Sequence, residues 1–350
     1  LASICDLACP HCFREYLATP DKIMNIEFAK KIILDAVNNS IPSIKFNWRG
    51  EPLLNPNLGK LIKFAKDKGM LETIINTNAT NLTEKKGIEL INSGLDYMIY
   101  SFDGGTKETY EKLRPGRFQK NKFEKVVQNI KKFNDLKNNL NAKFPYTKIQ
   151  MVVMDNNRNE VESFFEIFDT IVDEVTITPY QERGGKLDDL NKKNLEILRK
   201  YLSDNKLPED TPYMIDGEEN IFISTGRKTC KQIFQRLMVT YDGKAGMCCN
   251  DWGAQYNLGY LNDSGFDSKK QEKKVIKNVQ ENKKGFELLK NIKMPTEYNK
   301  PPKKVSNINE IWNSKQLNKV RNTHLLNNLD EVNICKNCNS KDTFIWKKIS

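Results

Sequence analysis

The stretch CDLACPHCF, residues 5–13, contains three of the chain's eight cysteines, spaced C-x3-C-x2-C. Thiolates are good ligands for iron, and a [4Fe–4S] cluster is usually held by four cysteines. Three cysteines therefore predict a cluster with one iron open to another ligand. The alternative is a zinc site completed by His11. However, His11 stands between two of the cysteines, and this spacing fits tetrahedral zinc poorly.

Helix and strand patterns alternate from residue 26 to about residue 180. The helical patterns cover 26–37, 58–69, 84–94, 123–133 and 160–168, with Phe28, Ile32, Ile33 and Val37 on one face of the first. The strand patterns cover 43–48, 72–78, 96–104, 148–154 and 174–180. Such alternation predicts a parallel sheet. With one more strand expected before residue 5, in a short upstream segment that we expect this sequence to lack, we count six β/α units. The predicted fold is α/β, a partial (β/α)6 TIM-like barrel with its ligands at the C-terminal ends of the strands.

Composition limits the class of protein. The chain has 350 residues, of which 38% are hydrophobic and 29% charged, so we expect a globular protein. Neither a long apolar run nor a signal-peptide pattern is present, and the cysteines are clustered, which together predict a reducing, cytoplasmic location and no membrane contact. The net charge of +11 indicates either AT-biased composition or an anionic substrate or partner. No nucleic-acid motif is present, and nucleic acid is not an expected partner.

The cysteine triplet followed by Phe13 resembles that of the radical S-adenosylmethionine (SAM) enzymes. In that family Cys5, Cys9 and Cys12 would hold a [4Fe–4S] cluster whose open iron binds SAM. Reductive cleavage of SAM gives a 5′-deoxyadenosyl radical, which abstracts a hydrogen atom from the substrate. A flavodoxin or ferredoxin type electron donor is the implied partner.

Further segments resemble the SAM-binding parts of that family. RGEP, residues 49–52, is similar to the family's GGEP segment, with Arg49 in place of the first glycine. TNAT (77–80) and SFDG (101–104) end the third and fourth expected strands. The resemblance implies SAM-binding roles for Arg49, Gly50, Glu51, Pro52, Asn78, Ser101, Asp103 and Arg114. A simple turn with a satisfied Glu51, and a helix-end salt bridge for Arg114, are the alternatives. The adenine contacts stay unassigned.

The second cysteine group resembles the C-terminal extension of SPASM-type and Twitch-type radical SAM enzymes. Cys230, Gly243 and Cys248 have the spacing C-x12-G-x4-C, and the segment ICKNC contains Cys335 and Cys338. Asp242 and Gly243 predict a hairpin turn. The resemblance implies a second, auxiliary [4Fe–4S] cluster held by these four cysteines, with structural zinc as the alternative.

The resemblance also suggests a domain organisation. We expect a radical SAM core at 1–185, a helical connector at 186–229 and an auxiliary domain at 230–350. The auxiliary domain includes a Lys-rich insertion at about 264–304, which is either a solvated surface element or a substrate lid.

The implied reaction starts from a small sugar-like or cyclitol-like substrate, or an anionic one. One-cluster relatives include dehydrogenases and epimerases of sugar and aminoglycoside pathways. Hydrogen abstraction from an alcohol-bearing carbon would end in a ketone, which we favour slightly, or in epimerisation. Peptide modification is the runner-up, and a non-catalytic metal-binding protein is the third reading. The molybdopterin-pathway cyclase ends in Gly-Arg-Arg, whereas this chain ends FIWKKIS, so we set a cyclase aside.

Two residues beside the second cysteine group are candidates for catalysis. Cys249 is either a hydrogen-atom donor or a buried inert thiol. Asp251 is either a general base or a turn cap. Polar residues near the expected strand ends are candidate substrate contacts: Asn47, Arg49, Gln150, Thr178, Tyr180, Glu182 and Arg183.

Overall fold

The computed structural model of the chain describes residues 1–12, 14, 21–180, 192–209, 211–215, 220–251, 254, 256, 258–261, 305–336, 338, 340 and 343–350. Phe13, Glu182, Arg183 and the Lys-rich insertion at 264–304 lie outside the described residues. Across the described ranges, no helix is both long enough and apolar enough to cross a bilayer.

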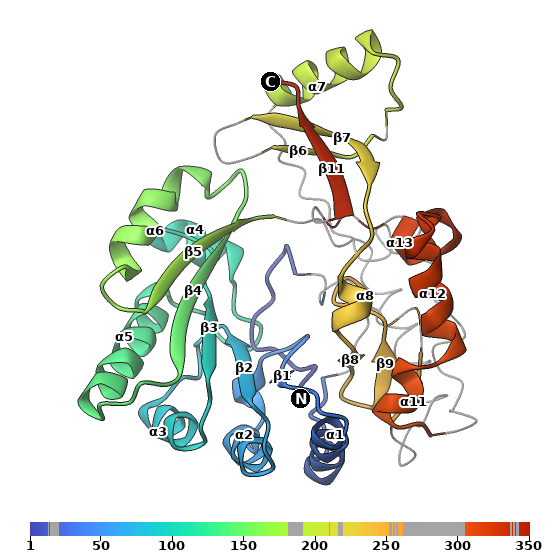
Figure 1. Cartoon of the computed structure of the whole chain (residues 1–350). Coiled ribbons are helices and arrows are strands. Elements are labelled where there is room, and N and C mark those ends of the chain that lie inside the picture. Colours follow the sequence, from blue (N-terminus) through green and yellow to red (C-terminus); the bar gives the residue numbers. More distant parts are fainter. Residues whose placement is uncertain are drawn as a thin grey trace.

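The N-terminal half is built around a five-stranded parallel sheet (Figure 1). Its strands, in both chain order and sheet order, are β1 (Ser43–Lys45), β2 (Glu72–Thr77), β3 (Tyr97–Ser101), β4 (Tyr146–Val153) and β5 (Glu174–Pro179). The intervening elements are α1 (Ile26–Asn38), η2 (Pro52–Leu54), α2 (Leu58–Asp67), α3 (Glu84–Asn92), α4 (Lys107–Leu113), α5 (Phe123–Asn139), η3 (Arg158–Glu160) and α6 (Val161–Phe168). Because all strands run in one direction, their C-terminal ends meet at one edge, where the loops carry the candidate site.

The periodicity of the sequence explains these elements. Asn25 caps α1, since its side-chain oxygen accepts from Glu27 N (2.9 Å) and Phe28 N (3.1 Å). The predicted apolar face is confirmed: Phe28 and Ile33 are buried, while Ile32 and Val37 pack against the same core. Strand β2 alternates half-buried and buried residues, as expected for a strand with one face on the core.

The expected sixth strand does not form in the described residues. Residues 1–4 run beside the β1 loop, with Leu1 N 3.3 Å from Phe46 O and Glu51 N donating to Ile4 O at 2.8 Å. Ala2 makes only an isolated bridge with Ile23. These few bonds do not make a ladder, and the sixth strand, which we expect upstream of residue 1, stays a prediction; the open, partial-barrel α/β character is confirmed.

Two small antiparallel sheets follow. The first joins β6 (Tyr213–Ile215), β7 (Ile221–Arg227) and β11 (Phe344–Lys348), with α7 (Lys192–Asp204) packed nearby. The second joins β8 (Met238–Val239), β9 (Lys244–Gly246) and β10 (Gly259–Tyr260). The remaining helices are α8 (Gln232–Gln235), α11 (Ile308–Trp312), α12 (Lys315–Leu325), η5 (Leu329–Glu331) and α13 (Asn333–Lys336). The predicted hairpin is present: β8 pairs with β9 across Gly243, whose φ is +91°.

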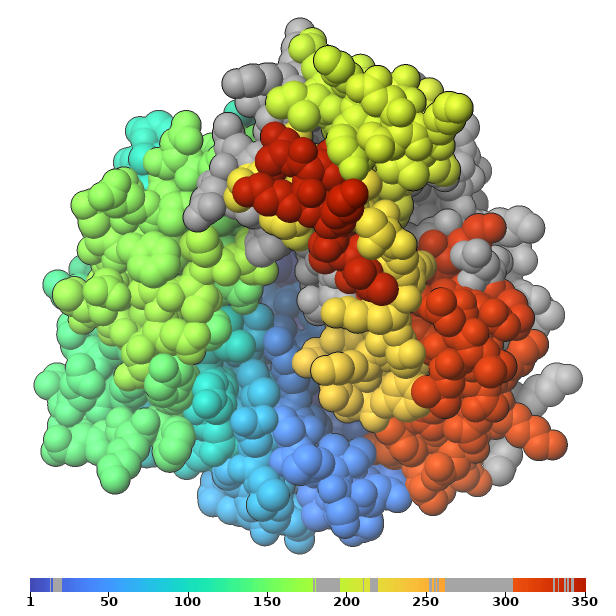
Figure 2. All heavy atoms as spheres, turned by 45° about the horizontal axis from the view of Figure 1, so that its top comes forward, coloured from blue at the N-terminus to red at the C-terminus, as the bar shows by residue number. Residues whose placement is uncertain are grey.

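The C-terminal elements pack on the open side of the parallel sheet. Trp48 Nε1, just after β1, donates to Cys249 O at 3.2 Å, and Asp35 of α1 accepts from Ile308 N at 2.7 Å. Figure 2 shows the surface hollowed between the sheet half, green to cyan, and the C-terminal part, yellow, with blue N-terminal residues at the bottom of the hollow.

Candidate active site and second cysteine group

The first cysteine group lies in a compact loop before α1. Cys12 N donates to Cys9 O at 2.9 Å, and Ala8 N donates to Pro115 O at 2.9 Å, which ties the loop to the end of α4. Burial raises the pKa of Cys5 to about 12 and that of Cys9 well above its usual value. The charge of Cys12 adds to the rise for both thiols, and that of Cys5 adds to the rise for Cys9. Three thiols thus share one water-poor space, where a cationic iron centre would favour their thiolate forms.

Gly50 of RGEP lies in close contact with the backbone of residues 2–4, immediately before Cys5. Its φ is +69°, and a Cβ at this position would lie 2.5 Å from Ile4 O and 2.7 Å from Ala2 O. Only glycine fits a left-handed conformation at such a close approach. The tight contact brings the RGEP backbone and the start of the cysteine loop together.

The carboxylate of Glu51 is buried and accepts three hydrogen bonds. Its Oε1 accepts from Leu53 N (3.0 Å) and Thr77 Oγ1 (2.7 Å), and its Oε2 accepts from Asn78 N (2.8 Å). Burial raises the pKa of Glu51 to about 7, although these hydrogen bonds oppose the rise. The side chain of Asn78 continues the network, with Nδ2 2.9 Å from Asp6 Oδ1 and 3.9 Å from Cys5 Sγ. A satisfied Glu51, one of the two expected alternatives, is therefore present, and it connects directly to the cysteine loop. Pro52, the fourth RGEP residue, begins η2 and is buried.

Asp103 anchors the other side of the loop. Its Oδ2 lies 3.0 Å from His11 Nε2 and accepts from Arg114 Nε at 2.9 Å, while Oδ1 accepts from Val152 N at 2.9 Å. Burial alone would raise the pKa of Asp103, but Arg114 and His11 hold it well below its usual range. The described partner of Arg114 is thus Asp103. Sequence reasoning considered His11 only as a zinc ligand and missed this contact.

The polar residues at the strand ends gather at one edge of the sheet, as predicted. Ser101 ends β3 and pairs with Gln150 of β4, and Thr178 lies in the neighbouring β5. Asn47 follows β1 and accepts from Asn76 N at 2.7 Å, so its oxygen already has a structural partner. Tyr180 follows β5, and its backbone N donates to Val153 O at 3.0 Å.

Residues 1–168 match the family model described as Radical SAM superfamily. This part of the chain is a radical SAM domain. The family implies a [4Fe–4S] cluster and SAM, and radical SAM chemistry is thereby supported for the chain. The residues fit these cofactors. Three thiols lie together, and the backbone of Gly50 lies so close to the start of the cysteine loop that any side chain there would clash.

Three further proteins are similar to this chain in sequence or in structure. A probable GTP 3′,8-cyclase of Methanococcus maripaludis (strain C5) is 27% identical over 259 residues, which cover 70% of this chain and 81% of the relative. Streptococcus suis SuiB bound to its precursor peptide SuiA has a TM-score of 0.51 at 15% identity, covering 72% of this chain and 58% of SuiB. AnSMEcpe with bound AdoMet has a TM-score of 0.51 at 19% identity, covering 83% and 80%.

These likenesses do not support the finer expectation of a sugar-pathway enzyme. The probable GTP 3′,8-cyclase belongs to the class that the C-terminal residues had led us to set aside, and it is not a sugar-pathway enzyme. The two solved structures are similar to this chain in fold. Their sequence identities of 15% and 19% support no conclusion about its activity.

The second cysteine group lies outside the segment that matches the radical SAM model. The Cys230 thiol interacts electrostatically with those of Cys338 and Cys249, and Cys335 interacts with Cys338 and Cys230. Burial raises the pKa of Cys335 to about 12. Arg227 supports this group from the backbone side, since its Nη1 donates to Cys335 O and its Nη2 to Cys338 O, both at 2.6 Å.

The adjacent cysteines Cys248 and Cys249 have different surroundings. Cys248 is buried in the main apolar core, and burial raises the pKa of its thiol. Cys249 is half-buried, with Sγ 3.7 Å from Gln232 Oε1 of α8, the helix that begins two residues after Cys230. The next residue, Asn250, has its Nδ2 3.7 Å from Cys338 Sγ. Cys249 and Asn250 thus contact both the helix that follows Cys230 and the thiol of Cys338.

His324 also belongs to this group, and the sequence analysis missed it. Its Nε2 lies 3.2 Å from Cys335 Sγ, and its Nδ1 accepts from Cys230 N at 3.4 Å. The residue is 1% exposed, and burial, together with the charge of Arg227, lowers the pKa of its ring. A lone histidine at the end of a helix gives no sequence signal for such a contact.

Asp251 and Lys244 lie between the second cysteine group and the radical SAM domain. Asp251 Oδ2 accepts from Tyr256 N at 3.1 Å, so the expected turn cap is present. Lys244 is 4% exposed, and burial, with the charge of Arg49, lowers its pKa to about 7 against the opposing effect of Asp242 and Asp251. Sequence reasoning did not single out Lys244; its place directly after the hairpin turn was the available signal.

In the part of the chain that the structure describes, no group of three or more His, Cys, Asp or Glu side chains has metal-site geometry. The ligand assignments therefore rest on residue type and proximity. The donor set of the second group nevertheless fits iron, because several thiols gather under the cationic Arg227 and the N–H donors of His324 and Asn250.

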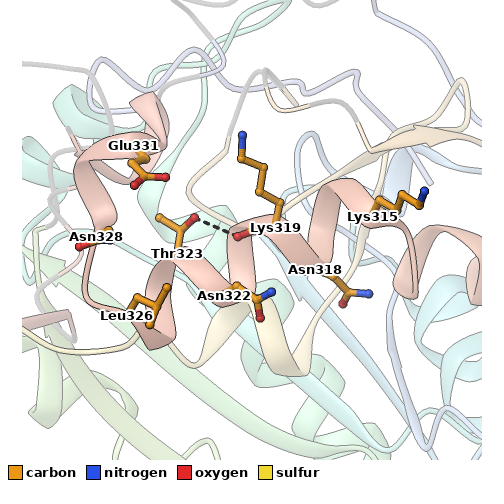
Figure 3. A pocket seen from close by; sticks show the side chains of 8 residues that line it. All are labelled: Lys315, Asn318, Lys319, Asn322, Thr323, Leu326, Asn328 and Glu331. Carbon is orange, nitrogen blue, oxygen red and sulfur yellow. Dashed lines mark hydrogen bonds between the residues drawn. The ribbon is translucent and has the colours of Figure 1, made fainter.

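A separate pocket of about 390 Å³ lies on the surface of α12 and η5 (Figure 3). It is lined by polar and charged side chains such as Lys315, Lys319 and Glu331, and Thr323 Oγ1 bonds Lys319 O at 2.9 Å beside it. Its lining includes none of the predicted site residues, so we assign it no role in the chemistry.

Proposed function

We propose that the chain is a radical SAM enzyme that removes a hydrogen atom from a small-molecule substrate. The observation that carries the proposal is the contact of Gly50 with the start of the cysteine loop, which brings Glu51 and Asn78 to Cys5. Cys5, Cys9 and Cys12 would hold the cluster, and the cluster with SAM would supply a 5′-deoxyadenosyl radical.

The surrounding residues would bind and orient SAM. Glu51 is a buried acceptor suited to a cationic or hydrogen-bearing amino group, in the way the GGEP-like segment implies. Asn78 fixes Asp6 and lies near Cys5 Sγ, which holds the loop in position. Asp103 and Arg114 form a polar wall beside Cys9, and Ser101 lies at the end of the same strand. We keep Arg49 and Pro52 in the SAM-binding set on the resemblance alone.

We also propose an auxiliary [4Fe–4S] cluster in an auxiliary domain at 230–350, joined by a connector at 186–229 to a core at 1–185. Cys230, Cys335 and Cys338 would supply three ligands, and the fourth would come from the Cys248–Cys249 pair. Family spacing favours Cys248, whereas the electrostatic interaction between the thiols of Cys249 and Cys230 favours Cys249. Such a cluster would supply an acceptor for one electron.

The favoured reaction is dehydrogenation of an alcohol-bearing carbon in a sugar-like or cyclitol-like substrate. The carbon loses a hydrogen atom, and the hydroxyl then loses a proton and the carbon radical an electron, which gives a ketone. Lys244, whose pKa is about 7, is a base matched to neutral pH, and Asp251 is the second candidate. Lys244 lies near Arg49, which would suit an anionic substrate. Alternatively, a hydrogen atom from Cys249 would return to the carbon and invert it.

A second candidate function is radical cyclisation of a purine nucleotide. It is favoured by the alignment with the probable GTP 3′,8-cyclase, which spans 81% of that relative. Peptide modification stays the less supported alternative, since the likeness to SuiB concerns the fold. We expect a flavodoxin or ferredoxin type donor in the cytoplasm as the source of electrons.

Iron and sulfide analysis under anaerobic conditions tests the proposal. Two clusters predict about eight iron atoms per chain, falling to about four in the Cys5/Cys9/Cys12→Ala variant. The wild type should cleave SAM with dithionite and the variant should not. An unchanged rate of SAM cleavage in the variant would overturn the proposal. About four iron atoms falling to none, with zinc bound, would make the second site structural. Incubation with alcohol-bearing sugars and with GTP then separates the two reactions by their products.

A further inference from the structure

The ring of His324 bridges two cysteines that lie 105 positions apart in the sequence. Cys230 N donates to its Nδ1 at 3.4 Å, and its Nε2 lies 3.2 Å from Cys335 Sγ. A backbone amide can only donate, so Nδ1 must be the acceptor nitrogen. In the neutral ring the hydrogen is then on Nε2, and it points at the sulfur of Cys335.

The position of the ring is set by the fold around it. His324 lies in the last turn of α12, which Ser314 caps by accepting from Leu317 N at 3.2 Å. The helix is held on the core by the buried Leu317 and Val320. Thr229 Oγ1 donates to His324 O at 3.2 Å, which fixes the end of the helix against the residue before Cys230. The donor nitrogen is therefore preorganised for the sulfur.

We propose that His324 is a positioning residue of the auxiliary cluster, whose Nε2–H donates to the Cys335 thiolate and raises the reduction potential of that cluster. The inference deepens the proposed function and rests on its second cluster. A hydrogen bond to a ligand sulfur stabilises the reduced state more, because that state carries more negative charge. The bond to the Cys230 amide opposes a role as ligand, since an Nε2 that carries hydrogen has no lone pair for a metal.

The first test uses pulsed electron paramagnetic resonance on ¹⁵N-histidine protein. The Cys5/Cys9/Cys12→Ala variant leaves only the auxiliary cluster, and the chain has two histidines, of which His11 belongs to the first site. We expect a weak ¹⁵N coupling together with an exchangeable proton. A strong coupling would mean direct ligation and overturn the proposal, and so would the absence of any coupling.

The second test measures the midpoint potential of the same cluster in three variants built on that background. His324→Leu removes the donor, and we expect the reduced-to-oxidised ratio at a fixed potential to fall about tenfold, which is about 59 mV for one electron. His324→Gln keeps an N–H and should stay near the parent. Lys319→Leu, on the exposed side of α12, is the control and should not shift the potential.

Iron content distinguishes a failure of this inference from a failure of the proposed function. If the Cys5/Cys9/Cys12→Ala variant binds no iron, the second cluster fails and the inference fails with it. If it binds about four iron atoms without ¹⁵N coupling, or if the Leu and Gln variants have equal potentials, only the role of His324 is overturned. If His324→Leu cannot retain its cluster, the ¹⁵N measurement on the parent decides.

Discussion

Arg114 donates twice to a single oxygen of Asp103, through Nε at 2.9 Å and Nη2 at 2.7 Å. Both side chains are almost completely buried, and they lie 11 positions apart at the ends of β3 and α4. The other carboxylate oxygen accepts from Val152 N at 2.9 Å. The ion pair also affects Cys9. The positive charge of the Arg114 guanidinium opposes the rise in the pKa of the Cys9 thiol.

Replacing Arg114 by Met should leave the carboxylate of Asp103 buried without its counter-charge. Breaking one side of a buried pair costs about 3–5 kcal/mol of unfolding free energy, and we expect a loss of this size in urea unfolding at pH 7. The Asp103→Asn/Arg114→Met double variant should lose less, because no uncompensated charge remains. Lys107→Met breaks the exposed pair with Glu124 and is the control. Equal losses for Arg114→Met and Lys107→Met would contradict the prediction.

The sequence predicted the local structure of the radical SAM domain well, because local structure follows from periodicity. The apolar spacing of α1 and the alternation of β2 are properties of neighbouring residues. The motif segments likewise fell at strand ends, where a parallel sheet gathers its loops. The sixth strand, which we expect upstream of residue 1, stays a prediction.

The contacts inside the site were much less predictable. The bonds of Trp48 to Cys249 and of Cys230 to His324 join residues that lie 201 and 94 positions apart. Such contacts depend on how the C-terminal elements pack on the sheet, and residue spacing does not encode that packing. Lys244 was missed for the same reason, since one of the charges that act on it, that of Arg49, comes from a distant part of the sequence.

Gly50→Ala should damage the first cysteine site more than another glycine substitution of the same backbone type. The new Cβ would lie 2.5 Å from Ile4 O, so the cysteine loop must move. Gly69→Ala is the matched control, because Gly69 also has a positive φ, +95°, but no atom within 4 Å of an added Cβ. We expect Gly69→Ala to cost about 1 kcal/mol and to keep its iron. Gly50→Ala should cost more and lose about four iron atoms per chain. Full iron content in Gly50→Ala would refute the close-packing argument.

Glu51 should make the stability of the apoprotein depend on pH. Its pKa is about 7 in the folded chain, against an ordinary value of 4.5. The folded state therefore binds the proton more tightly than the unfolded state. This contribution is fully present below pH 4.5 and is lost as pH rises through 7, by at most about 3 kcal/mol.

Glu51→Gln lacks this titration. The unfolding free energy of the wild type minus that of the variant should fall between pH 4.5 and 7 in urea titrations. Glu108→Gln, at an exposed position on α4, is the control and should leave the wild-type profile unchanged. A constant difference between wild type and Glu51→Gln across this range would be evidence against the raised pKa.

The adjacent cysteines Cys248 and Cys249 provide a matched pair of variants, and Ser replaces each thiol at nearly constant size. If Cys249 is the fourth ligand, as its electrostatic interaction with Cys230 favours, Cys249→Ser should lose auxiliary iron. Cys248→Ser should then keep about eight iron atoms per chain. If Cys248 is the ligand, the iron contents are reversed. Loss of iron in both variants or in neither would contradict a single fourth ligand from this pair.

The role of Cys249 as a hydrogen-atom donor is open only where Cys249→Ser keeps its iron. In that case Cys249→Ala should still cleave SAM, because the thiol would act after hydrogen abstraction, on the substrate radical. An epimerised product should disappear, since inversion needs a hydrogen atom delivered from the thiol. The product of dehydrogenation, a ketone, needs no such donor and should persist. Chromatography of the products, with incorporation of solvent deuterium, separates the two. Epimerisation with deuterium incorporation in Cys249→Ala would exclude this thiol as the donor.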